Sequence, residues 1–520
     1  MQLQIPRGAA NGDGQTPFTG DFETFVDHVL QHFHVPSVSI GIVDGDKTHL
    51  KCFGNAKVSG EEATEDTLYL LASVTKSFTA TTLLSVLEEQ NGKDGQPDIG
   101  LNAKISSIIP DDFVLQDEYA TRHATLQDAL CHVLGVASAE GCYGGEGYTL
   151  SEAIRSLRHL PMSGELREKH EYLNMGYMTI QHVVEKLTGK PIEKSHARCI
   201  WDPLGMTSTF ASLDEARNAD NTLATGYTWD PILERLIEAP YSKDYPLIGG
   251  GGLTSSIKDL TGYLRAVVHG SLPLHPSWQK ELIKPRTIAS ESNDPNRSTD
   301  LYALGWGVSH LRGQKMVSHS GGINGFSSKL TFFPDRKWGL AILTNADGNG
   351  YDAVQTIVSR LIEDFLDVKP DERKDVIAQL DKILQDRVKQ YFGTRDRLYP
   401  QLPEPPLPLA GHLSEYAGSY YHPAYRTLHL KVAKPPKDKP IAQDTKAVLH
   451  ADVRRLVDFT LDVEHVSGQF FIAWTDTETT NFGYKAGVKA MFTLGSGGSV
   501  EKWGVDIEGS GRLVWFIKVD

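Results

Sequence analysis

The sequence has few cysteines and no long apolar run. No apolar stretch approaches the roughly 18 to 20 residues that a membrane helix needs, and the N-terminal segment lacks the basic and apolar parts of a secretory signal. We therefore expect a cytoplasmic protein that does not enter a membrane. The four cysteines form no C-x-x-C pair and no metal-ligand spacing: Cys52, Cys131, Cys142 and Cys199. Neither a disulfide framework, a metal nor an organic cofactor is expected.

The chain also lacks an excess of positive charge. It holds 52 Lys and Arg against 66 Asp and Glu, a net charge of −14. This balance argues against nucleic acid or an anionic membrane as a general partner, and we interpret the acidity as a contribution to solubility. The sequence leaves the oligomeric state open, a homo-oligomer included. A length of 520 residues, 40% of them hydrophobic, favours two globular domains.

The order of the predicted elements suggests four segments. Residues 1–18 read as a flexible tail, and strand patterns at both ends of a mostly helical middle predict an α+β domain over 19–368. Its antiparallel sheet would be closed by strands from the two ends and flanked by helices. A charged helical stretch and a proline-rich linker occupy 369–410. Short alternating runs over 411–520 predict a small all-β barrel or sandwich domain.

The stretch from Leu71 to Lys76 carries the first chemical motif. Ser73 and Lys76 stand three positions apart, so on a helix they share one face. Apolar residues repeat at helical spacing between Ala80 and Leu87, which places Ser73 at a helix N-terminus. A serine hydroxyl needs an adjacent base, and a desolvated lysine supplies one because burial disfavours its charged form. Ser73 is therefore a candidate nucleophile.

Ser-x-x-Lys alone is a weak motif. The same spacing recurs at Ser255, Ser277 and Ser499, so chance accounts for most matches. The alternative reading makes Ser73 an N-cap and Lys76 a solvated residue of the first turn. The decision between these readings depends on motifs further along the chain.

Two further motifs contain residues suited to proton transfer. Tyr172-x-Asn174 precedes a predicted helix, and a phenol held between two cations would lose its proton more easily. His319-x-Gly321 precedes a predicted strand, where glycine lets a backbone N–H approach a ligand. Each motif alone also fits a structural role, a capped helix or a loop.

The four glycines at 249–252 lie just before a predicted helix. No Gly-x-Gly-x-x-Gly pattern is present and no Lys-Ser/Thr follows, so phosphate binding is not favoured. The run instead predicts close backbone packing or an active-site wall.

Taken in order, Ser73-x-x-Lys76, Tyr172-x-Asn174 and His319-x-Gly321 resemble the three motifs of the serine β-lactamase and penicillin-binding-protein superfamily. With a tyrosine at its first position, the second motif resembles that of class C β-lactamases and their esterase and D-aminopeptidase relatives. Flanking segments continue the likeness: Thr125–His132, Tyr172–Tyr177, Glu185–Pro191, Pro203–Met206, Gly251–Ser255, Leu304–Gly307, Gly325–Ser328 and Leu343–Asn345. The resemblance covers about residues 20–366, and residues 411–520 look like the lipocalin-like β-barrel of some members.

The resemblance implies a β-lactamase/transpeptidase-like fold and a role for each motif residue. Ser73 would be the nucleophile, Lys76 its base, and Tyr172 the group that passes protons to and from the leaving group. The backbone N–H groups of Ser73 and Gly322 would form the oxyanion hole. Four further residues complete the site that the resemblance implies. His319 would have a catalytic place, and three residues would contact the substrate: Asn174, Ser320 and Gly321.

One position departs from the family pattern. His319 stands where β-lactamases and penicillin-binding proteins carry a lysine, and a neutral histidine offers no fixed charge to a substrate carboxylate. This weakens the β-lactamase and transpeptidase alternatives. We predict a serine hydrolase that acts on an ester or amide of a small molecule or short peptide. An acyltransferase that uses an alcohol or amine acceptor, a β-lactamase, and a non-catalytic binding protein of the same fold remain as alternatives.

Overall fold

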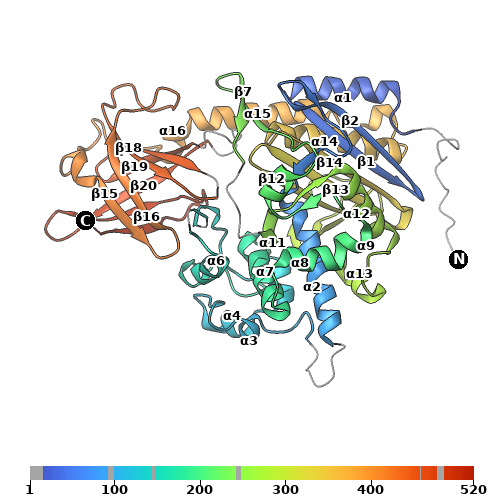
Figure 1. Cartoon of the computed structure of the whole chain (residues 1–520). Helices are drawn as coiled ribbons and strands as arrows, with labels where there is room; N and C mark the ends of the chain where they lie inside the picture. The colour runs from blue at the N-terminus through green and yellow to red at the C-terminus, as the bar shows by residue number, and fades with distance from the viewer. Residues whose placement is uncertain are drawn as a thin grey trace.

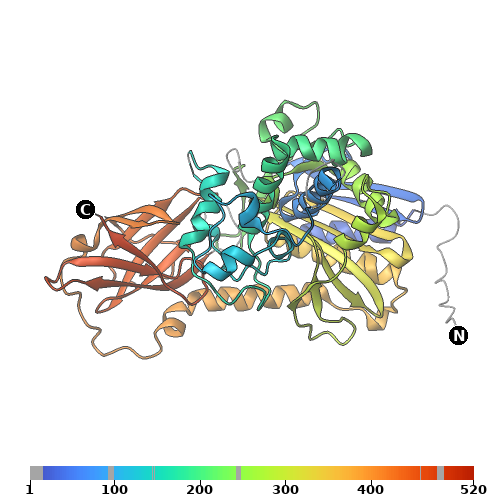
Figure 2. The same ribbon diagram turned by 90° about the horizontal axis from the view of Figure 1, so that it is seen from below.

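The computed structural model describes residues 16–91, 99–142, 144–145, 147–241, 248–456, 458–476 and 485–519. Most of the predicted tail, residues 1–18, lies outside these ranges. A mixed α/β body and a β-barrel stand side by side, and the long helix α15 (Val376–Phe392) runs between them (Figures 1 and 2). No helix in the described ranges is long and apolar enough to cross a membrane.

The α/β body is built on an antiparallel sheet in which the two ends of the domain meet. Its strand order is β3-β2-β1-β14-β13-β12-β11-β10-β9 in the described chain. Strand β1 pairs with β2 on one side and with β14 on the other, with Ile40 opposite Ile342. These strands are β1 (Ser37–Asp44), β2 (Lys47–Lys57), β3 (Glu61–Glu62), β9 (Thr287–Ser290), β10 (Asp300–Tyr302), β11 (Gly307–Leu311), β12 (Gln314–Ile323), β13 (Phe326–Phe333) and β14 (Trp338–Thr344). The predicted closure of the sheet by both ends is confirmed.

Helices cover both faces of this sheet. On one face, α1 (Gly20–His32) and α14 (Asn349–Phe365) share an apolar cluster with alternate residues of β1 and β14, such as Ile42 and Leu340. On the other face, α2 (Thr75–Asn91) and α12 (Ile257–His269) pack in the main core. Alternation of side chains along the strands explains the two separate clusters.

A mostly helical region fills the sequence between β3 and β9, and helices of this region form the lower part of the α/β body in Figure 1. Its α-helices are α3 (Ile105–Ile108), α4 (Glu118–His123), α5 (Leu126–Leu130), α6 (Leu150–Ser156), α7 (Asn174–Thr188), α8 (Ile192–His196), α9 (Asp202–Leu204), α10 (Leu213–Asn218), α11 (Ile248–Gly251) and α13 (Pro276–Leu282). Its short strands are β4 (Leu68–Leu70), β5 (Thr209–Phe210), β6 (Gly226–Asp230), β7 (Arg235–Ala239) and β8 (Thr254–Ser256). Helix α7 ends at Gly189, which adopts the left-handed conformation, as the predicted glycine stop requires.

Short single-turn segments connect these elements. Six are 3₁₀ turns, in the described ranges: η1 (Ala72–Val74), η2 (Glu140–Cys142), η3 (Leu157–His159), η5 (Pro334–Arg336), η6 (Pro370–Glu372) and η7 (Leu413–Tyr416). The segment η4 (Ala197–Trp201) is a π-helical turn between α8 and α9. The first two of these turns carry residues of the candidate site.

The C-terminal region is a closed antiparallel barrel, which decides between the barrel and sandwich alternatives. Its strands are β15 (Gly418–His422), β16 (Arg426–Ala433), β17 (Val448–Val453), β18 (Phe459–Ser467), β19 (Phe470–Asp476), β20 (Ala486–Leu494), β21 (Val500–Val505) and β22 (Val514–Lys518). Buried aromatic rings in mutual contact fill its interior, among them Tyr420, Phe471, Phe492 and Trp503.

Helix α15 joins the two bodies through its two ends. Its first half packs Ile377 and Leu380 against the cluster of α1 and α14. Its second half places Tyr391 in a cluster with Trp474 on the outside of the barrel, and α16 (Thr394–Leu398) follows. In Figure 2 this helix spans the distance between the two bodies. The few apolar residues of this densely charged helix pack against one body at each end, which explains why the segment is helical.

Candidate active site

Ser73 lies on the 3₁₀ turn η1, between β4 and α2. The segment is held from behind, because β4 pairs with β8 and the Leu71 N–H donates to the Leu253 carbonyl. Ala72 has a φ of +46°, a left-handed conformation that is strained for a residue with a side chain. This geometry turns the half-buried Ser73 out of the strand at the start of α2. The predicted helix start is confirmed to within the η1 turn.

Lys76 lies directly behind the serine and is completely buried. Its Nζ donates to Ser73 Oγ at 3.0 Å, to Asn174 Oδ1 at 2.5 Å and to the Gly250 carbonyl at 2.5 Å. The structure therefore brings together Ser73, Lys76 and Asn174, as the sequence predicted, and it overturns the reading of Lys76 as a solvated first-turn residue.

Burial lowers the pKa of Lys76 to about 7, and the Glu140 carboxylate opposes this shift. The cause is desolvation, since none of the three acceptors in contact with Nζ carries a charge. A neutral amine has two N–H groups and one lone pair. If the two N–H groups stay on the two short acceptors, Asn174 Oδ1 and the Gly250 carbonyl, the lone pair faces the Ser73 hydroxyl.

The orientation of the Asn174 amide is fixed by Glu140. Asn174 Nδ2 donates to Glu140 Oε2 at 3.0 Å, and a carboxylate oxygen only accepts. The amide oxygen must therefore point to Lys76. Both ends of the amide have partners within the protein, and Glu140, on the η2 turn, enters the site from outside the three motifs.

Tyr172 lies beside the lysine but is not held between two cations. Lys76 Nζ is 4.9 Å from the centre of the Tyr172 ring. Burial lowers the pKa of His319 to about 3, with a smaller effect from Lys76, so this imidazole is neutral at physiological pH. Burial raises the pKa of Tyr172, although the Ser73 hydroxyl partly offsets the effect. The expectation of an easily ionised phenol is therefore wrong, because desolvation acts on the phenol and the histidine alike.

His319 is locked by hydrogen bonds on both ring nitrogens. Its Nδ1 lies 2.7 Å from the Ser320 carbonyl, which only accepts, so Nδ1 carries the proton. Its Nε2 then accepts from the Tyr302 hydroxyl at 2.9 Å. The ring lies 6.4 Å from that of Tyr172, centre to centre. At this position the site presents a neutral, fully bonded imidazole.

The end of β12 passes the η1 turn very closely at Gly321. A side chain there would meet the Leu71 carbonyl at 2.3 Å from its Cβ, whereas Gly322 is exposed and faces open space. Ser328, on the neighbouring strand, donates from its hydroxyl to the same Leu71 carbonyl. This packing holds β12 beside Ser73, with Gly322 next in the chain.

The predicted close backbone packing of the glycine run is confirmed. Residues 248–251 form α11, which lies between α2 and α7. The Gly249 carbonyl accepts from Thr79, and its N–H donates to Gln181. A Cβ on Gly249 would lie 2.8 Å from the Tyr177 carbonyl. The close approach allows the Gly250 carbonyl to reach Lys76.

A cleft of about 520 Å³ opens next to these residues. Its walls include Leu70, Ile323 and Gly251, which are close in sequence to Ser73, Gly322 and Gly250. The remaining apolar wall comes from Ala211, Leu213 and Ile248, and two carboxylates lie on its lining, Glu193 and Glu215. Lysine and arginine are absent from the described lining. The cleft thus combines apolar walls with two acidic side chains, a lining that disfavours an anionic group.

Three contributors to the site were not predicted from the sequence: Glu140, Gly250 and Tyr302. Glu140 and Tyr302 lie in no motif, so nothing in the sequence pointed to them, whereas the glycine run gave a partial signal for Gly250. In the described ranges, no group of three or more histidine, cysteine or acidic side chains is placed to hold a metal ion.

The fold is β-lactamase/transpeptidase-like, and the η1 turn with Ser73, the buried Lys76 and the end of β12 lie together in it. Residues 22–363 match the Beta-lactamase family model, and the chain belongs to this family. The resemblance inferred from the motifs is confirmed over nearly the same residues.

Comparisons over the whole chain give more specific relatives. An unguisins hydrolase of Aspergillus campestris is 30% identical over 502 residues, which cover 95% of this chain and 90% of the relative. The octameric penicillin-binding protein homologue of Pyrococcus abyssi shares the fold, with a TM-score of 0.58 and 21% identity over 96% of this chain and 99% of its own. The D-amino acid amidase of Ochrobactrum anthropi SV3, with a TM-score of 0.53 and 24% identity, covers 66% of this chain and 98% of its own.

Proposed function

We propose that this chain is a serine hydrolase that cleaves an amide or ester through an acyl-enzyme on Ser73. The observation that carries the proposal is the surroundings of Lys76, a completely buried amine in contact with the Ser73 hydroxyl and with two neutral acceptors. This arrangement keeps the amine available as a base near neutral pH.

Acylation begins with proton transfer from Ser73 Oγ to Lys76 Nζ. The Oγ then attacks the substrate carbonyl carbon, and the carbonyl oxygen gains the negative charge. We assign the oxyanion hole to the backbone N–H groups of Ser73 and Gly322, which is exposed at the end of β12. Loss of one such donor typically costs about 10²–10³-fold in kcat.

The tyrosine completes the proton path. Tyr172 gives its hydroxyl proton to the leaving nitrogen or oxygen and recovers a proton from the Lys76 ammonium, so the phenol is neutral before and after the step. Its raised pKa fits this role as a relay and does not favour a phenolate base. In deacylation the same groups pass a proton in reverse from water, which attacks the acyl carbon and releases Ser73.

The cleft and His319 suggest the kind of substrate. The apolar lining, the acidic side chains Glu193 and Glu215, and the neutral His319 all disfavour a free carboxylate on the bound group. We propose an amide of a small molecule or short peptide with an apolar acyl part. The names of the relatives, an unguisins hydrolase and a D-amino acid amidase, support hydrolysis as the reaction.

The proposal extends to the domain boundaries, the cellular location and the oligomeric state. We propose a catalytic domain over 19–368, a helix and linker over 369–410, and a barrel domain over 411–520, in a cytoplasmic protein. The octameric relative, which matches 96% of this chain, supports a homo-oligomer. Light scattering on a gel-filtration column tests this last point, and a monomeric mass at micromolar concentration would exclude it.

The test is intact-protein mass spectrometry after incubation with p-nitrophenyl esters, D- and L-aminoacyl p-nitroanilides and nitrocefin. Wild type and Ser73→Ala are compared, with and without an alcohol or amine acceptor. We expect an adduct or turnover that requires Ser73, with anilides among the substrates. Acceleration by the acceptor would indicate an acyltransferase, and turnover of nitrocefin alone a β-lactamase. A signal that survives Ser73→Ala, or no reaction even with a fluorophosphonate, would reject the proposal.

A further inference from the structure

The segment that carries Glu140 packs directly against the barrel. Gly144 has a φ of +96°, and a Cβ there would lie 2.4 Å from the backbone nitrogen of Leu456, in the β17–β18 turn. At Gly141 a Cβ would lie 3.2 Å from Glu508 Oε1, in the β21–β22 connection. Glycine therefore permits backbone contact between the helical region and two loops of the barrel.

Glu508 binds this segment through its backbone. Its Oε2 accepts from the Glu140 N–H at 3.0 Å, and its Oε1 accepts from the Gly141 N–H at 3.1 Å. The Tyr425 hydroxyl, also from the barrel, donates to Oε1 at 2.8 Å. One carboxylate thus holds two consecutive peptide groups of η2 and is itself held by a neighbouring tyrosine.

The side chain of Glu140 continues the connection toward the nucleophile. Its carboxylate accepts from Asn174 Nδ2, and Asn174 Oδ1 accepts from Lys76 Nζ. Four hydrogen-bonded residues therefore lead from the barrel to the catalytic amine: Glu508, Glu140, Asn174 and Lys76.

We propose that Glu508 is a positioning residue for the active site, so that the barrel forms a working part of the catalytic centre. It acts by fixing the η2 turn, which fixes the Glu140 carboxylate and through it the orientation of the Asn174 amide. The inference rests on the proposed function, because it assigns Lys76 as the base.

The consequence of losing Glu508 follows from the hydrogen-bond directions. Without its carboxylate, the N–H groups of Glu140 and Gly141 lose their acceptor, and η2 is free to move away from Asn174. The amide can then turn its Nδ2 toward Lys76, whose lone pair would accept from Asn174 instead of facing Ser73. Retreat of Glu140 also removes the negative charge that opposes the lowered pKa of Lys76.

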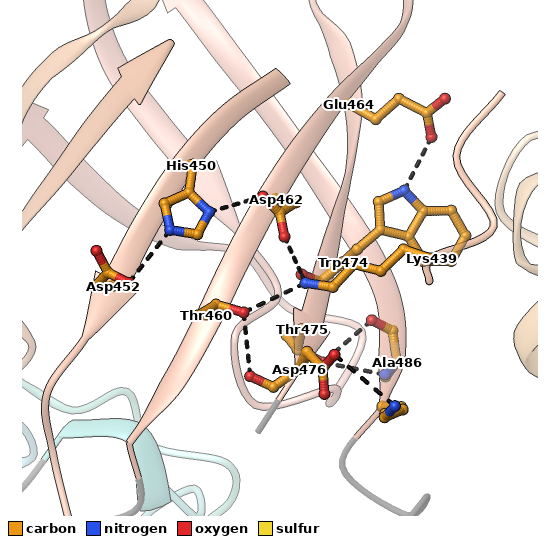
Figure 3. Close-up of polar contacts among 11 residues, drawn as sticks. Lys439, His450, Asp452, Thr460, Asp462, Glu464, Trp474, Thr475, Asp476 and Ala486 are labelled. Carbon is orange, nitrogen blue, oxygen red and sulfur yellow. Dashed lines mark hydrogen bonds and ion pairs between the residues drawn. The ribbon is translucent and has the colours of Figure 1, made fainter. Parts of the chain in front are cut away.

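A second contact between barrel and α/β body provides a matched control. Lys485, at the start of β20, donates to Asp230 of β6 at 2.8 Å, and both side chains are buried. Lys485 Nζ also lies 3.9 Å from Asp476 Oδ2 at the end of β19, and Asp476 belongs to the polar contacts on β18 and β19 that Figure 3 shows. The ion pair of Lys485 and Asp230 joins the same two bodies without contacting η2.

The experiment measures fluorophosphonate labelling of Ser73 in the full-length protein as a function of pH. Glu508→Ala should lower the plateau rate by about 10–100-fold, as misplacement by about 1 Å does in other sites, and Glu508→Gln should lower it less because one acceptor oxygen remains. The midpoint of the rise in labelling rate with pH should move to lower pH.

The control Lys485→Gln should lower only the melting temperature. Glu140→Gln should reproduce the shift of the midpoint and add little to it in Glu508→Ala/Glu140→Gln.

The labelling rates and midpoints decide whether Glu508 positions the active site. Wild-type rates and midpoints in both Glu508 variants would overturn it. So would equal losses in Glu508→Gln and Lys485→Gln with no change of midpoint, since the barrel would then act through stability alone. If Ser73 of the wild type is not labelled at all, the proposed function fails. A labelled wild type with an insensitive Glu508→Ala rejects only the role of Glu508.

Discussion

Two buried lysines, one in each body, stand in opposite surroundings. Lys439 of the barrel has a side chain that is 3% exposed, and its Nζ donates to the Asp462 carboxylate at 2.5 Å, with Thr460 and the Trp474 carbonyl as further acceptors (Figure 3). Lys76 is equally buried and also makes a contact of 2.5 Å, but its partner is the neutral amide oxygen of Asn174.

The difference lies in the direct contact with a carboxylate. Asp462 compensates the charge of Lys439, so this ammonium joins a structural network on the outer surface of β18. The Glu140 carboxylate acts on Lys76 from beyond Asn174, and burial dominates the pKa of Lys76. We infer that a neutral residue between the lysine and the carboxylate lets burial lower the pKa of the amine, as a base requires.

Removing each lysine gives the largest expected contrast. Lys76→Met should reduce Ser73 labelling and turnover by about 10³-fold or more, because the serine loses its base. Lys439→Met should lower the melting temperature and leave the labelling rate of the folded protein unchanged. Labelling kinetics and thermal unfolding, measured side by side, check both. Comparable labelling loss in the two variants would contradict the distinction.

Breaking the barrel pair should produce the next largest effect. Asp462→Asn leaves Lys439 without its carboxylate at a site where both partners are at most 5% exposed. We expect about 3–5 kcal/mol of destabilisation, as for other buried pairs that lose one member. His450 contacts the carboxylates of both Asp462 and Asp452. Asp452→Asn, which alters the exposed carboxylate of the two, is the control and should change little. Urea unfolding followed by tryptophan fluorescence measures both.

Moving the carboxylate from Glu140 to position 174 should give Lys76 a direct carboxylate contact like that of Lys439. In Asn174→Asp/Glu140→Gln the total charge is unchanged, but the carboxylate contacts Nζ directly. The pKa of Lys76 should then rise above about 7 by about 1–3 units. Activity should fall by about 10–100-fold at pH 7 and recover toward pH 9–10. A pH profile with an unchanged midpoint would argue against Lys76 as the titrating base.

The stability of wild type relative to Lys76→Met should depend on pH. Burial lowers the pKa of Lys76 to about 7 from 10.5, so the folded protein binds fewer protons than the unfolded chain between these values. Wild type therefore gains stability relative to Lys76→Met as pH rises, by about 1.4 kcal/mol per pH unit. Below pH 7 the difference should be constant. Denaturant titrations at pH 6, 8 and 9.5 measure the slope.

Local sequence predicted what is local in the site. Ser73 and Lys76 share a helical turn, so their contact was predictable from their spacing. The close packing of the glycine run was predictable because the run matches no phosphate-binding pattern. The state of Tyr172 was not predictable, because desolvation depends on what covers a residue and not on its neighbours in sequence.

Long-range contacts explain the residues that were missed. Glu140 and Glu508 are 368 positions apart and belong to no motif, yet the Glu508 carboxylate accepts hydrogen bonds across the two bodies from the N–H groups of Glu140 and Gly141. Likewise, Tyr302 reaches His319 from a different strand. The fold class was predictable because strand alternation and helix periodicity are regular, whereas these pairings require the packed arrangement of both bodies.

The pairing of β1 with β14 has a consequence for synthesis on the ribosome. Strand β1 is complete at residue 44, but its partner ends at residue 344, and β13 and β14 must emerge before the central sheet can close. The nascent chain therefore exposes an unpaired apolar strand edge for most of translation. We expect the α/β body to need chaperone protection late into elongation, and stop codons placed before β14 to yield aggregated chains.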